Sequence, residues 1–565
     1  MSIPALLQDG IFVLVVFLLV KPVGIYLKRV FAHERTFLDP VLGPVERVIY
    51  RVTHIDSVRE MNARQYAVAF VLFSLVGILA LYALLRVQRF LPWFDPVHMT
   101  TPMTPDLAMN TAISFATTTT WQAYAGETTM SYLSQLTGLA AQNFLAGAAG
   151  LAVGMAFIRG FARQGTATLG NFWRDLVRAM LWVLLPLTLI GTVILIWQGV
   201  PINFSPYTQV HTLEGSTQII AQGPVAALEF IKNLGTGGGG FFNVNGAHPY
   251  ENPTPLTNLL EMLAIVVLPA ALTYTFGLMV GNTRQGWMLF WVMVVLFMGG
   301  LAVCSWAEQQ GNPAFTALGI TGGNMEGKEM RFGIGGSTLV AETTSNTSTG
   351  STNSMHDSYT PLGGSIPVLN MLMGEIIFGG LGTGIYSIIM VALVGLFLTG
   401  LMIGRTPEYL GKTIAPSEMK FLALYTLMGP FAVVPFVALA VVTPAGLAGL
   451  TTNAGPHGLT EILNTYASSM ANNGQTFASL NANSLFYNGT TAVVMLLGRF
   501  GLAIPALLLA GRFAKQTSRP FTPGKLRTDS VLFALVVIFT ALIVVGLTYF
   551  AVLALGPIIE QLRMG

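Results

Sequence analysis

Long apolar stretches alternate with polar connections along the whole chain. Each stretch contains about 20 or more mostly apolar residues, which is the length that an α-helix needs to cross the hydrocarbon core of a bilayer. The pattern therefore predicts ten membrane-spanning helices. They centre on residues 3–27, 66–90, 133–158, 177–198, 257–280, 286–306, 368–402, 420–443, 491–511 and 530–556. The first stretch has no basic segment before it and no small-residue cleavage site after it, so we expect a retained span.

The composition is typical of an integral membrane protein. Of the residues, 53% are hydrophobic and 9% are charged, whereas soluble domains carry about 25% charged residues. The net charge of +3 is too small to indicate a nucleic-acid partner. Cys304 is the only cysteine of the sequence, which excludes a disulfide framework.

Basic residues mark every second connection between the predicted spans. They concentrate after spans one, three, five, seven and nine, and the alternate connections are long and poor in Lys and Arg. By the positive-inside rule, the basic connections lie in the cytoplasm and both termini lie outside. The residues concerned include Lys28, Arg29, Arg159, Arg163, Arg284, Arg405, Lys412, Arg512, Arg519 and Lys525.

Each long outer connection contains one further apolar segment, and this segment is too short to span. The four segments read DLAMNTAISFATTT (106–119), PVAALEFIKNLGT (224–236), GGSTLVAETTSNT (335–347) and GLTEILNTYASSM (458–470). Their length indicates re-entrant helices. The polar loops that follow read TTTTWQ (117–122), GTGGGG (235–240), STGSTN (348–353) and NNGQ (472–475).

The four polar loops recur at a nearly constant interval. With Thr119, Thr236, Thr349 and Asn473 as anchors, the separations are 117, 113 and 124 residues. This interval predicts an all-α membrane protein with a fourfold, pseudo-symmetric repeat of span, short helix, polar loop and span. The predicted divisions are an N-terminal span and cytoplasmic loop (1–63), four repeats (64–165, 166–283, 284–412 and 413–520) and a C-terminal span (521–565).

The residue types of these loops favour a site for a monovalent cation. Irregular backbone at membrane depth must be buried in protein or line a wet cavity, so we expect the four loops to share an interior. Rings of loop carbonyl oxygens can replace the hydration shell of potassium. The short helices direct their negative C-terminal ends at the loops. Divalent ions usually require Asp or Glu ligands, and the loops have none at their anchors.

Several strings outside the loops resemble a known family. They are AHPYENPTPLTN (247–258), SMHDSYTPLGG (354–364), MIGRTPEYLGK (402–412), AGPHG (454–458) and LGRFG (497–501). They resemble the potassium-binding A subunit of the Kdp potassium-importing ATPase over essentially the whole chain. The resemblance implies a potassium-channel-like fold with an asymmetric selectivity filter in a bacterial inner membrane. It also implies a separate P-type subunit that hydrolyses ATP, and two small membrane subunits.

The resemblance also implies which residues bind potassium. They are Thr118, Thr119, Thr236, Gly237, Gly238, Ser348, Thr349, Gly350, Asn472, Asn473 and Gly474, with Gln122 behind the first loop. This chain departs from the family in two places. Thr118 and Thr120 stand where the first loop of the family often has asparagines, and the stretch TTSNTS (343–348) lengthens the third loop. The register of the third site therefore stays open.

Two charged residues lie inside apolar runs, where charge is costly and usually functional. Glu375 and Arg499 each resemble a buried charged position of the family. We expect Glu375 to attract the ion below the filter and Arg499 to balance charge near the base of the pore. The alternative is a mutual ion pair that joins spans seven and nine. Lys232, at the end of the second short helix, is expected to point to an outer surface or a partner.

The chain shows no ATP site of its own. GRTPEYLGKT (404–413) approaches a phosphate-binding loop, but Thr406 stands where that motif needs a glycine. The Asp-Lys-Thr-Gly phosphorylation motif is absent from the sequence. We therefore expect potassium to be the transported ion and ATP to be used only by a partner subunit. Two alternatives stay open: a stand-alone channel-like potassium transporter, and a non-transporting scaffold subunit.

Overall fold

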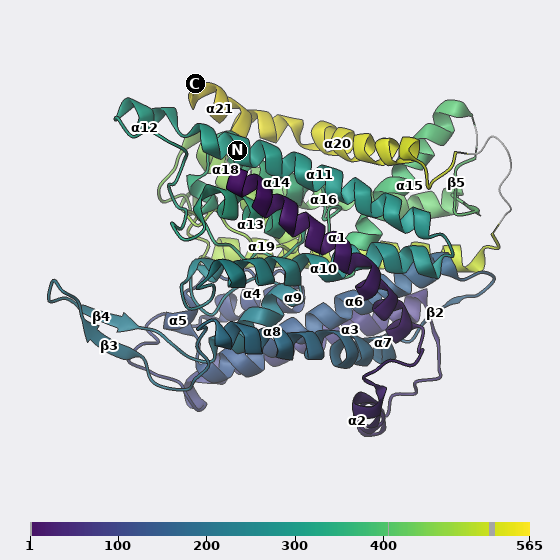
Figure 1. Cartoon of the computed structure of the whole chain (residues 1–565), viewed down its shortest axis with the longest axis horizontal. Coiled ribbons are helices and arrows are strands. Elements are labelled where there is room, and N and C mark those ends of the chain that lie inside the picture. Colours follow the sequence, from purple (N-terminus) through teal and green to yellow (C-terminus); the bar gives the residue numbers. More distant parts are fainter. Residues whose placement is uncertain (1–2, 405, 519–525, 565) are drawn as a thin grey trace.

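The computed structural model describes residues 3–404, 406–518 and 526–564, with the side chains of residues 3, 4 and 403 left aside. Arg405, Arg519, Lys525 and the predicted boundary between residues 520 and 521 lie outside the described residues. Most long helices run along one common direction, and the two ends of the chain lie near each other at one end of the bundle (Figure 1).

Ten helical segments of the described chain are long and apolar enough to cross a membrane, as predicted. They are α1 (Ile3–Phe31), α3 (Ala63–Val87), η2 (Ser134–Ala140) with α6 (Ala141–Ala162), α7 (Phe172–Arg178) with η3 (Ala179–Leu184) and α8 (Leu185–Trp197), α10 (Pro255–Met279), α11 (Thr283–Gln310), α15 (Thr383–Ile403), α16 (Pro416–Val442), α19 (Leu485–Lys515), and α20 (Val531–Leu553) with η6 (Ala554–Ile558) and α21 (Ile559–Met564). The predicted class, an all-α membrane protein, is confirmed.

The four short helices lie between successive spans, each followed by its polar loop. They are α4 (Pro105–Ala116), α9 (Val225–Leu234), α13 (Gly333–Asn346) and α18 (Gly455–Met470). Most of their residues are buried, which fits helices that enter the bundle without facing lipid. The order of span, short helix, loop and span therefore occurs four times, while the exact boundaries of the repeats stay a prediction.

The remaining elements are short and lie in the connections. The helices are α2 (Asp39–Val52), η1 (Gln88–Phe90), α5 (Gly126–Thr129), η4 (Asn245–Ala247), α12 (Pro313–Ala317), η5 (His356–Ser358), α14 (Pro361–Leu372) and α17 (Pro444–Leu447). The strands form three antiparallel pairs: β1 (Met61–Asn62) with β2 (Thr168–Gly170), β3 (Thr208–His211) with β4 (Thr217–Ile220), and β5 (Glu408–Tyr409) with β6 (Lys412–Thr413). The β3–β4 hairpin projects from the end of the bundle that carries both termini (Figure 1).

The seventh predicted span, residues 368–402, is not one helix. α14 ends at Leu372 and α15 begins at Thr383. Between them, Glu375 and Phe378 adopt the left-handed backbone conformation, with φ of 60° and 47°. A right-handed helix cannot continue through such residues. The prediction of a continuous span was wrong because the apolar composition of MGEIIFGGLGTG hid a turn.

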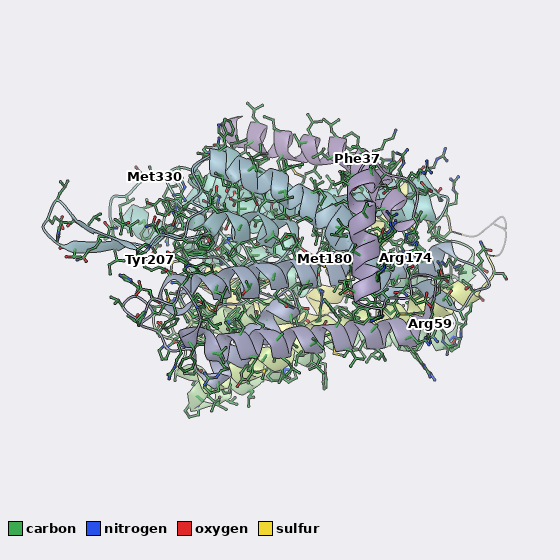
Figure 2. The ribbon with its side chains drawn as sticks, turned by 90° about the horizontal axis from the view of Figure 1, so that it is seen from below. Phe37, Arg59, Arg174, Met180, Tyr207 and Met330 are labelled. Carbon is green, nitrogen blue, oxygen red and sulfur yellow. The ribbon has the colours of Figure 1, made fainter. Side chains whose placement is uncertain are left out.

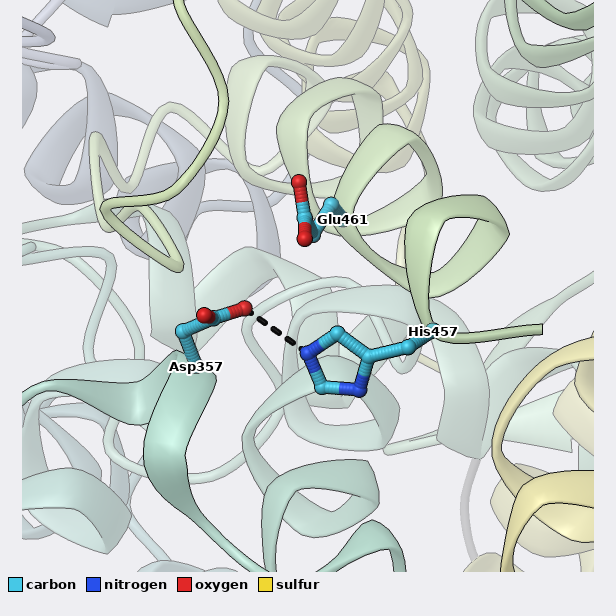
Figure 3. Close-up of side chains that lie close together, drawn as sticks. All are labelled: Asp357, His457 and Glu461. Atoms are coloured by element: carbon cyan, nitrogen blue, oxygen red, sulfur yellow. Dashed lines mark hydrogen bonds and ion pairs between the residues drawn. The ribbon is translucent and has the colours of Figure 1, made fainter. Parts of the chain in front are cut away.

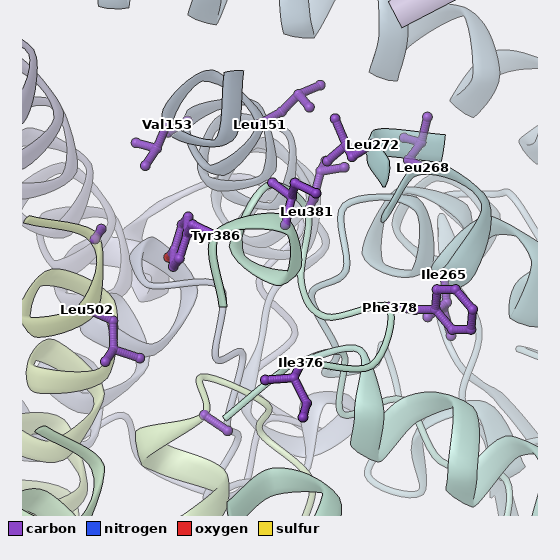
Figure 4. Packing of buried hydrophobic residues seen from close by; sticks show 14 of the residues in the cluster. Leu151, Val153, Ile265, Leu268, Leu272, Ile376, Phe378, Leu381, Tyr386 and Leu502 are labelled. Atoms are coloured by element: carbon purple, nitrogen blue, oxygen red, sulfur yellow. The ribbon is translucent and has the colours of Figure 1, made fainter. Parts of the chain in front are cut away.

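This break is buried in protein. Ile376, Phe378 and Leu381 lie among side chains of the surrounding helices (Figure 4). Beside them, Gly382 packs against the backbone of Gly150 in α6 so closely that a Cβ atom would clash with the Gly150 carbonyl. Irregular backbone is tolerated at membrane depth under this condition. The break therefore places a short loop in the interior, next to the polar loops.

Candidate functional site: four loops around one axis

Each short helix ends two residues before a residue with left-handed backbone. These residues are Thr118, Thr236, Ser348 and Asn472, with φ of 64°, 48°, 57° and 48°. The shared offset aligns the residues that follow them, which are Thr119, Gly237, Thr349 and Asn473. The anchor Thr236 chosen from the sequence is thus one residue early. The third loop has the same register as the others, because residues 343–346 of the stretch TTSNTS belong to α13 and not to the loop.

The four loops contact one another in a closed order. In loops two, three and four, a Cβ atom added to the glycine two residues after the left-handed residue named above would clash with a carbonyl oxygen of the next loop. These contacts are Gly238 with Thr349, Gly350 with Asn473, and Gly474 with Thr119. The order closes because the N–H of Gly238 donates to Oγ1 of Thr120 in the first loop. The structure thus brings all four loops around one axis.

The ring is pseudo-symmetric. Thr120, Gly350 and Gly474 share left-handed backbone, with φ of 51°, 79° and 84°. In the second loop this conformation falls on Gly239, with φ of 73°, one residue later. The first loop also has a threonine where the other three have glycine. The four sides of the axis therefore differ in shape and in side-chain oxygens.

Side chains of the aligned residues hold the loops to the helices. Oγ1 of Thr349 lies 2.8 Å from Oγ1 of Thr347, and the Asn473 amide donates to the Thr344 carbonyl over 2.8 Å. The Asn472 amide donates to Oγ1 of Thr119 over 2.9 Å. These polar side chains are engaged within the protein and fix the loops to the short helices and to one another.

The helix ends give the axis a negative field without a fixed charge. α4, α9, α13 and α18 all end at the loops, and the C-terminus of a helix carries about half a negative elementary charge. No Asp or Glu occurs in residues 117–122, 235–240, 348–353 or 472–475. Uncharged oxygens in such a field suit a monovalent cation better than Ca²⁺ or Mg²⁺.

At the end that carries Gln122, the loops open into a vestibule. Gln122 joins the first two loops there: its Nε2 donates to the Gly240 carbonyl over 3.1 Å, and its Oε1 accepts from the Gly240 N–H over 2.8 Å. Beyond this bridge lies a cavity of about 670 Å³. Its lining includes Thr120, Gln122, Asn245, Lys328, Asn353 and Gly474. A hydrated ion can therefore reach the loops from this side.

Arg499 lies at the inner end of the first loop. Its Nη1 donates to Oγ1 of Thr118 over 3.1 Å, and its Nη2 donates to the Ala146 carbonyl over 3.0 Å. The guanidinium carbon is 5.4 Å from the centre of the Phe70 ring. The side chain is buried, so its charge is fixed at the start of the loop.

Glu375 lies at the inner end of the third loop, in the break of the seventh span. Its Oε2 accepts from the Gly380 N–H over 3.3 Å, and it lines a cavity of about 100 Å³ between the break, α16, α18 and α20. Among the ion pairs of the described residues, none joins Glu375 to Arg499. The alternative of a direct pair between spans seven and nine is therefore not what the structure has.

Lys232 corrects one expectation from the sequence. Its side chain is fully buried behind the second loop and does not point to an outer surface. Its Nζ lies 2.7 Å from Oε2 of Glu229 and 3.8 Å from Oε1 of Glu251. Glu251 also accepts a hydrogen bond from the Phe241 N–H over 2.6 Å. The carboxylates stabilise the buried ammonium and join it to the backbone after the loop.

Sequence reasoning missed the carboxylates behind the loops. Besides Glu229 and Glu251, it passed over Glu342 in α13, which accepts from the Asn346 and Asn370 amides over 2.7 and 3.0 Å. Glu229 and Lys232 stand three residues apart in a short apolar helix, and this spacing was the available signal. Glu251 had no such signal because its partner is far away in the sequence.

A second charged cluster joins two of the family-like strings at the N-terminal end of α18. Nε2 of His457 lies 2.8 Å from Oδ1 of Asp357 (Figure 3). Its Nδ1 lies 2.7 Å from Oε1 of Glu560. Glu461 lies nearby and accepts from Asn453 over 2.7 Å. Burial opposes protonation of the ring, but the hydrogen bonds to Asp357 and Glu560 outweigh it and raise the pKa of His457 to about 10. A protonated ring held by two carboxylates is an ionic clamp.

Ten spans that surround four converging loops define a channel-like membrane protein. Comparison with known protein families identifies the family. Residues 10–562 match the family model described as "Potassium-transporting ATPase A subunit". The chain belongs to this family.

Curated relatives are similar over nearly their whole length. A protein of Methylobacterium radiotolerans is 51% identical over 100% of this chain and 98% of its own. A protein of Rhodospirillum centenum is 52% identical over 96% of this chain and 94% of its own. A protein of Mesorhizobium japonicum is 50% identical over 100% of this chain and 99% of its own. Each is named "Potassium-transporting ATPase potassium-binding subunit".

Proposed function

We propose that this chain is the potassium-binding and translocating subunit of an ATP-driven, high-affinity potassium importer. The closed order of loop contacts carries the proposal, because it surrounds one axis with main-chain oxygens and no carboxylate. Rings of this kind take the place of water around a bare potassium ion. The family and the names of its members support the same function.

The ligands in this proposal are the residues expected from the sequence. Potassium enters through the vestibule beside Gln122, binds among the loop oxygens and then meets Glu375. Arg499 opposes free passage at the base. The ligands are Thr118, Thr119, Thr236, Gly237, Gly238, Ser348, Thr349, Gly350, Asn472, Asn473 and Gly474.

The energy source and the orientation complete the proposal. A P-type ATPase subunit hydrolyses ATP, and two small membrane subunits accompany it. The chain lies in a bacterial inner membrane with both termini outside. The distribution of Lys and Arg over alternate connections supports this orientation.

One purification tests the proposal against its alternatives. The tagged full chain is isolated from its host in mild detergent and assayed for ATP hydrolysis and, in liposomes, for rubidium flux. Co-purification of a P-type ATPase that potassium stimulates is the expected result. Flux by the chain alone would instead indicate a stand-alone transporter, and neither activity would indicate a scaffold.

A further inference from the structure

The helix α2 is attached to the rest of the chain through a largely polar contact. Glu46, the buried residue of this helix, accepts from Nε of Arg178 over 2.9 Å and from the Tyr50 hydroxyl over 2.6 Å. The partly buried Leu42 and Ile49 pack beside it. The side of α2 that faces the protein is therefore held by Glu46 and its hydrogen bonds to Arg178 and Tyr50.

The outward side of α2 is apolar. Val41, Val45, Val48 and Val52 have exposed fractions of 69%, 42%, 57% and 72%. Because an α-helix turns about 100° per residue, spacings of four, three and four place these valines in one narrow stripe. The polar side of α2 contacts the protein and the valine stripe faces away from it. Such an exposed apolar stripe indicates that the surroundings of the helix are apolar.

The direction of α2 fits the plane of a membrane. In Figure 1 the helix is seen nearly end-on, and in Figure 2 it crosses the long spanning helices, with Phe37 near one end. Its first residue, Asp39, follows the end of the first span by only a short connection. The helix therefore runs across the direction of the spanning helices, as a helix in the plane of a membrane surface does.

Aromatic side chains set the depth of α2. The ring of Phe37 is 5.7 Å from that of Tyr26, near the end of the first span. The Trp182 indole N–H lies within hydrogen-bond distance of Oγ1 of Thr36, at 3.1 Å, and of Oδ1 of Asp39, at 3.0 Å. Tyr and Trp are enriched at the level of the lipid headgroups. These contacts tie the start of α2 to aromatic residues of the kind found at the boundary of a bilayer.

Positive charge flanks the valine stripe. Arg47 and Arg51 are exposed, and at about 100° per residue they lie along one edge of the stripe. The acidic side chains of the helix are turned away, since Asp39 contacts Trp182 and Glu46 contacts Arg178. The exposed part of α2 therefore combines an apolar stripe with two guanidinium groups, which pair well with phosphate.

We propose that α2 is an interfacial helix that inserts its valines into the adjoining leaflet and binds the phosphates of anionic lipids through Arg47 and Arg51. Charge complementarity and the in-plane direction favour a lipid surface over a protein partner. The inference concerns a part of the chain away from the potassium site and is independent of the proposed function.

Fluorescence quenching tests this inference on the full chain with its co-purifying subunits. Cys304 is buried and is replaced by alanine, and an environment-sensitive label is attached to V45C, V48C or, as a matched control, R47C. The vesicles contain phosphatidylcholine alone or equal parts of phosphatidylcholine and phosphatidylglycerol. Brominated lipids report contact with the acyl chains, and iodide reports contact with water.

The expected result is several-fold stronger quenching by brominated lipid at Val45 and Val48 than at Arg47, with the reverse order for iodide. In vesicles with phosphatidylglycerol, quenching of the labels at Val45 and Val48 by brominated lipid should be stronger than in phosphatidylcholine alone. The double substitution R47Q/R51Q should abolish this increase. Equal iodide quenching at all three positions would overturn the inference. Protection of the valine labels from both quenchers would overturn it as well, because it would place a protein partner on α2.

Discussion

Nη1 of Arg499 donates a hydrogen bond to Oγ1 of Thr118 over 3.1 Å. These residues are 381 positions apart in the chain, yet their contact fixes a positive charge at the inner end of the first loop. We expected Arg499 to balance charge near the base of the pore, and this contact shows where its guanidinium group lies. It also makes the role of each loop end testable by single substitutions.

Replacement of Arg499 by glutamine should make the pathway leaky. The variant removes the charge that opposes free passage and weakens the hold on Thr118, since hydrogen bonds to charged groups contribute about 1.5–3 kcal/mol. We expect rubidium flux in liposomes that no longer requires ATP. Arg512→Gln, in the last turn of the same helix and exposed, is the control. Flux that stays fully ATP-dependent in Arg499→Gln would contradict the role.

Replacement of Glu375 by glutamine should weaken the apparent affinity for potassium. Glutamine has nearly the same shape and keeps an acceptor for the Gly380 N–H, so the change removes mainly the negative charge. We expect roughly a tenfold loss, which corresponds to about 1.4 kcal/mol. The measurement is the potassium dependence of ATP hydrolysis in the purified complex, with Glu214→Gln in the exposed hairpin as control. An unchanged potassium dependence would count against Glu375 on the ion path.

Replacement of Gly474 by alanine should disrupt the ring of loops. Its backbone is left-handed, with φ of 84°, and a Cβ atom would clash with the Thr119 carbonyl. Gly455→Ala is a matched control, because Gly455 has φ of 70° and open space around its Cβ position. In both variants, alanine in the left-handed conformation costs about 1–2 kcal/mol of backbone strain. We expect rubidium binding at equilibrium to be lost only in Gly474→Ala, and an equal effect of both variants would refute the contact.

Replacement of Lys232 by methionine should destabilise the protein. It leaves Glu229 and Glu251 buried without their ammonium partner, and breaking a buried ion pair costs about 3–5 kcal/mol. We expect a clear fall of the melting temperature of the chain in detergent, and its partial recovery in Glu229→Gln/Lys232→Met. The exposed Lys420→Met should melt like the unaltered chain. A Lys232→Met variant that melts normally would show that the pair is dispensable.

The clamp around His457 should weaken in alkaline solution. Its pKa is raised to about 10 in the folded protein, above the value of about 6.5 in an unfolded chain. Its contribution to stability is thus fully present below pH 6.5 and is lost as the pH rises toward 10. The melting temperature should fall over this range, and less so in His457→Gln. Parallel pH profiles of the two proteins would argue against the clamp.

Local sequence determined most of the architecture. The ten spans follow from apolar length, because the bilayer requires about 20 apolar residues in each crossing. The four short helices and their loops were equally visible, since an apolar segment of 13 or 14 residues followed by Gly, Thr, Ser or Asn can neither cross nor continue as a helix. The candidate ion ligands lie in these loops, and their chemical types were readable without coordinates.

The exact alignment of the loops was not readable. Thr236 looked equivalent to Thr119, but the end of α9 shows that Gly237 takes that place. The break at Glu375 was hidden for a related reason: its neighbours are as apolar as those of a span. Phe378, one of its left-handed residues, is held in place by packing against other helices (Figure 4).

The sequence by itself thus determined how many times the chain crosses the membrane, where it turns back and which oxygens it offers to an ion. Only the tertiary structure decided which loop touches which, that Lys232 faces two buried carboxylates and that His457 meets Asp357 and Glu560. The reason is physical. Burial in lipid and backbone conformation are set largely by neighbouring residues, whereas a buried charge is stabilised by whatever partner the folded chain brings within a few ångströms.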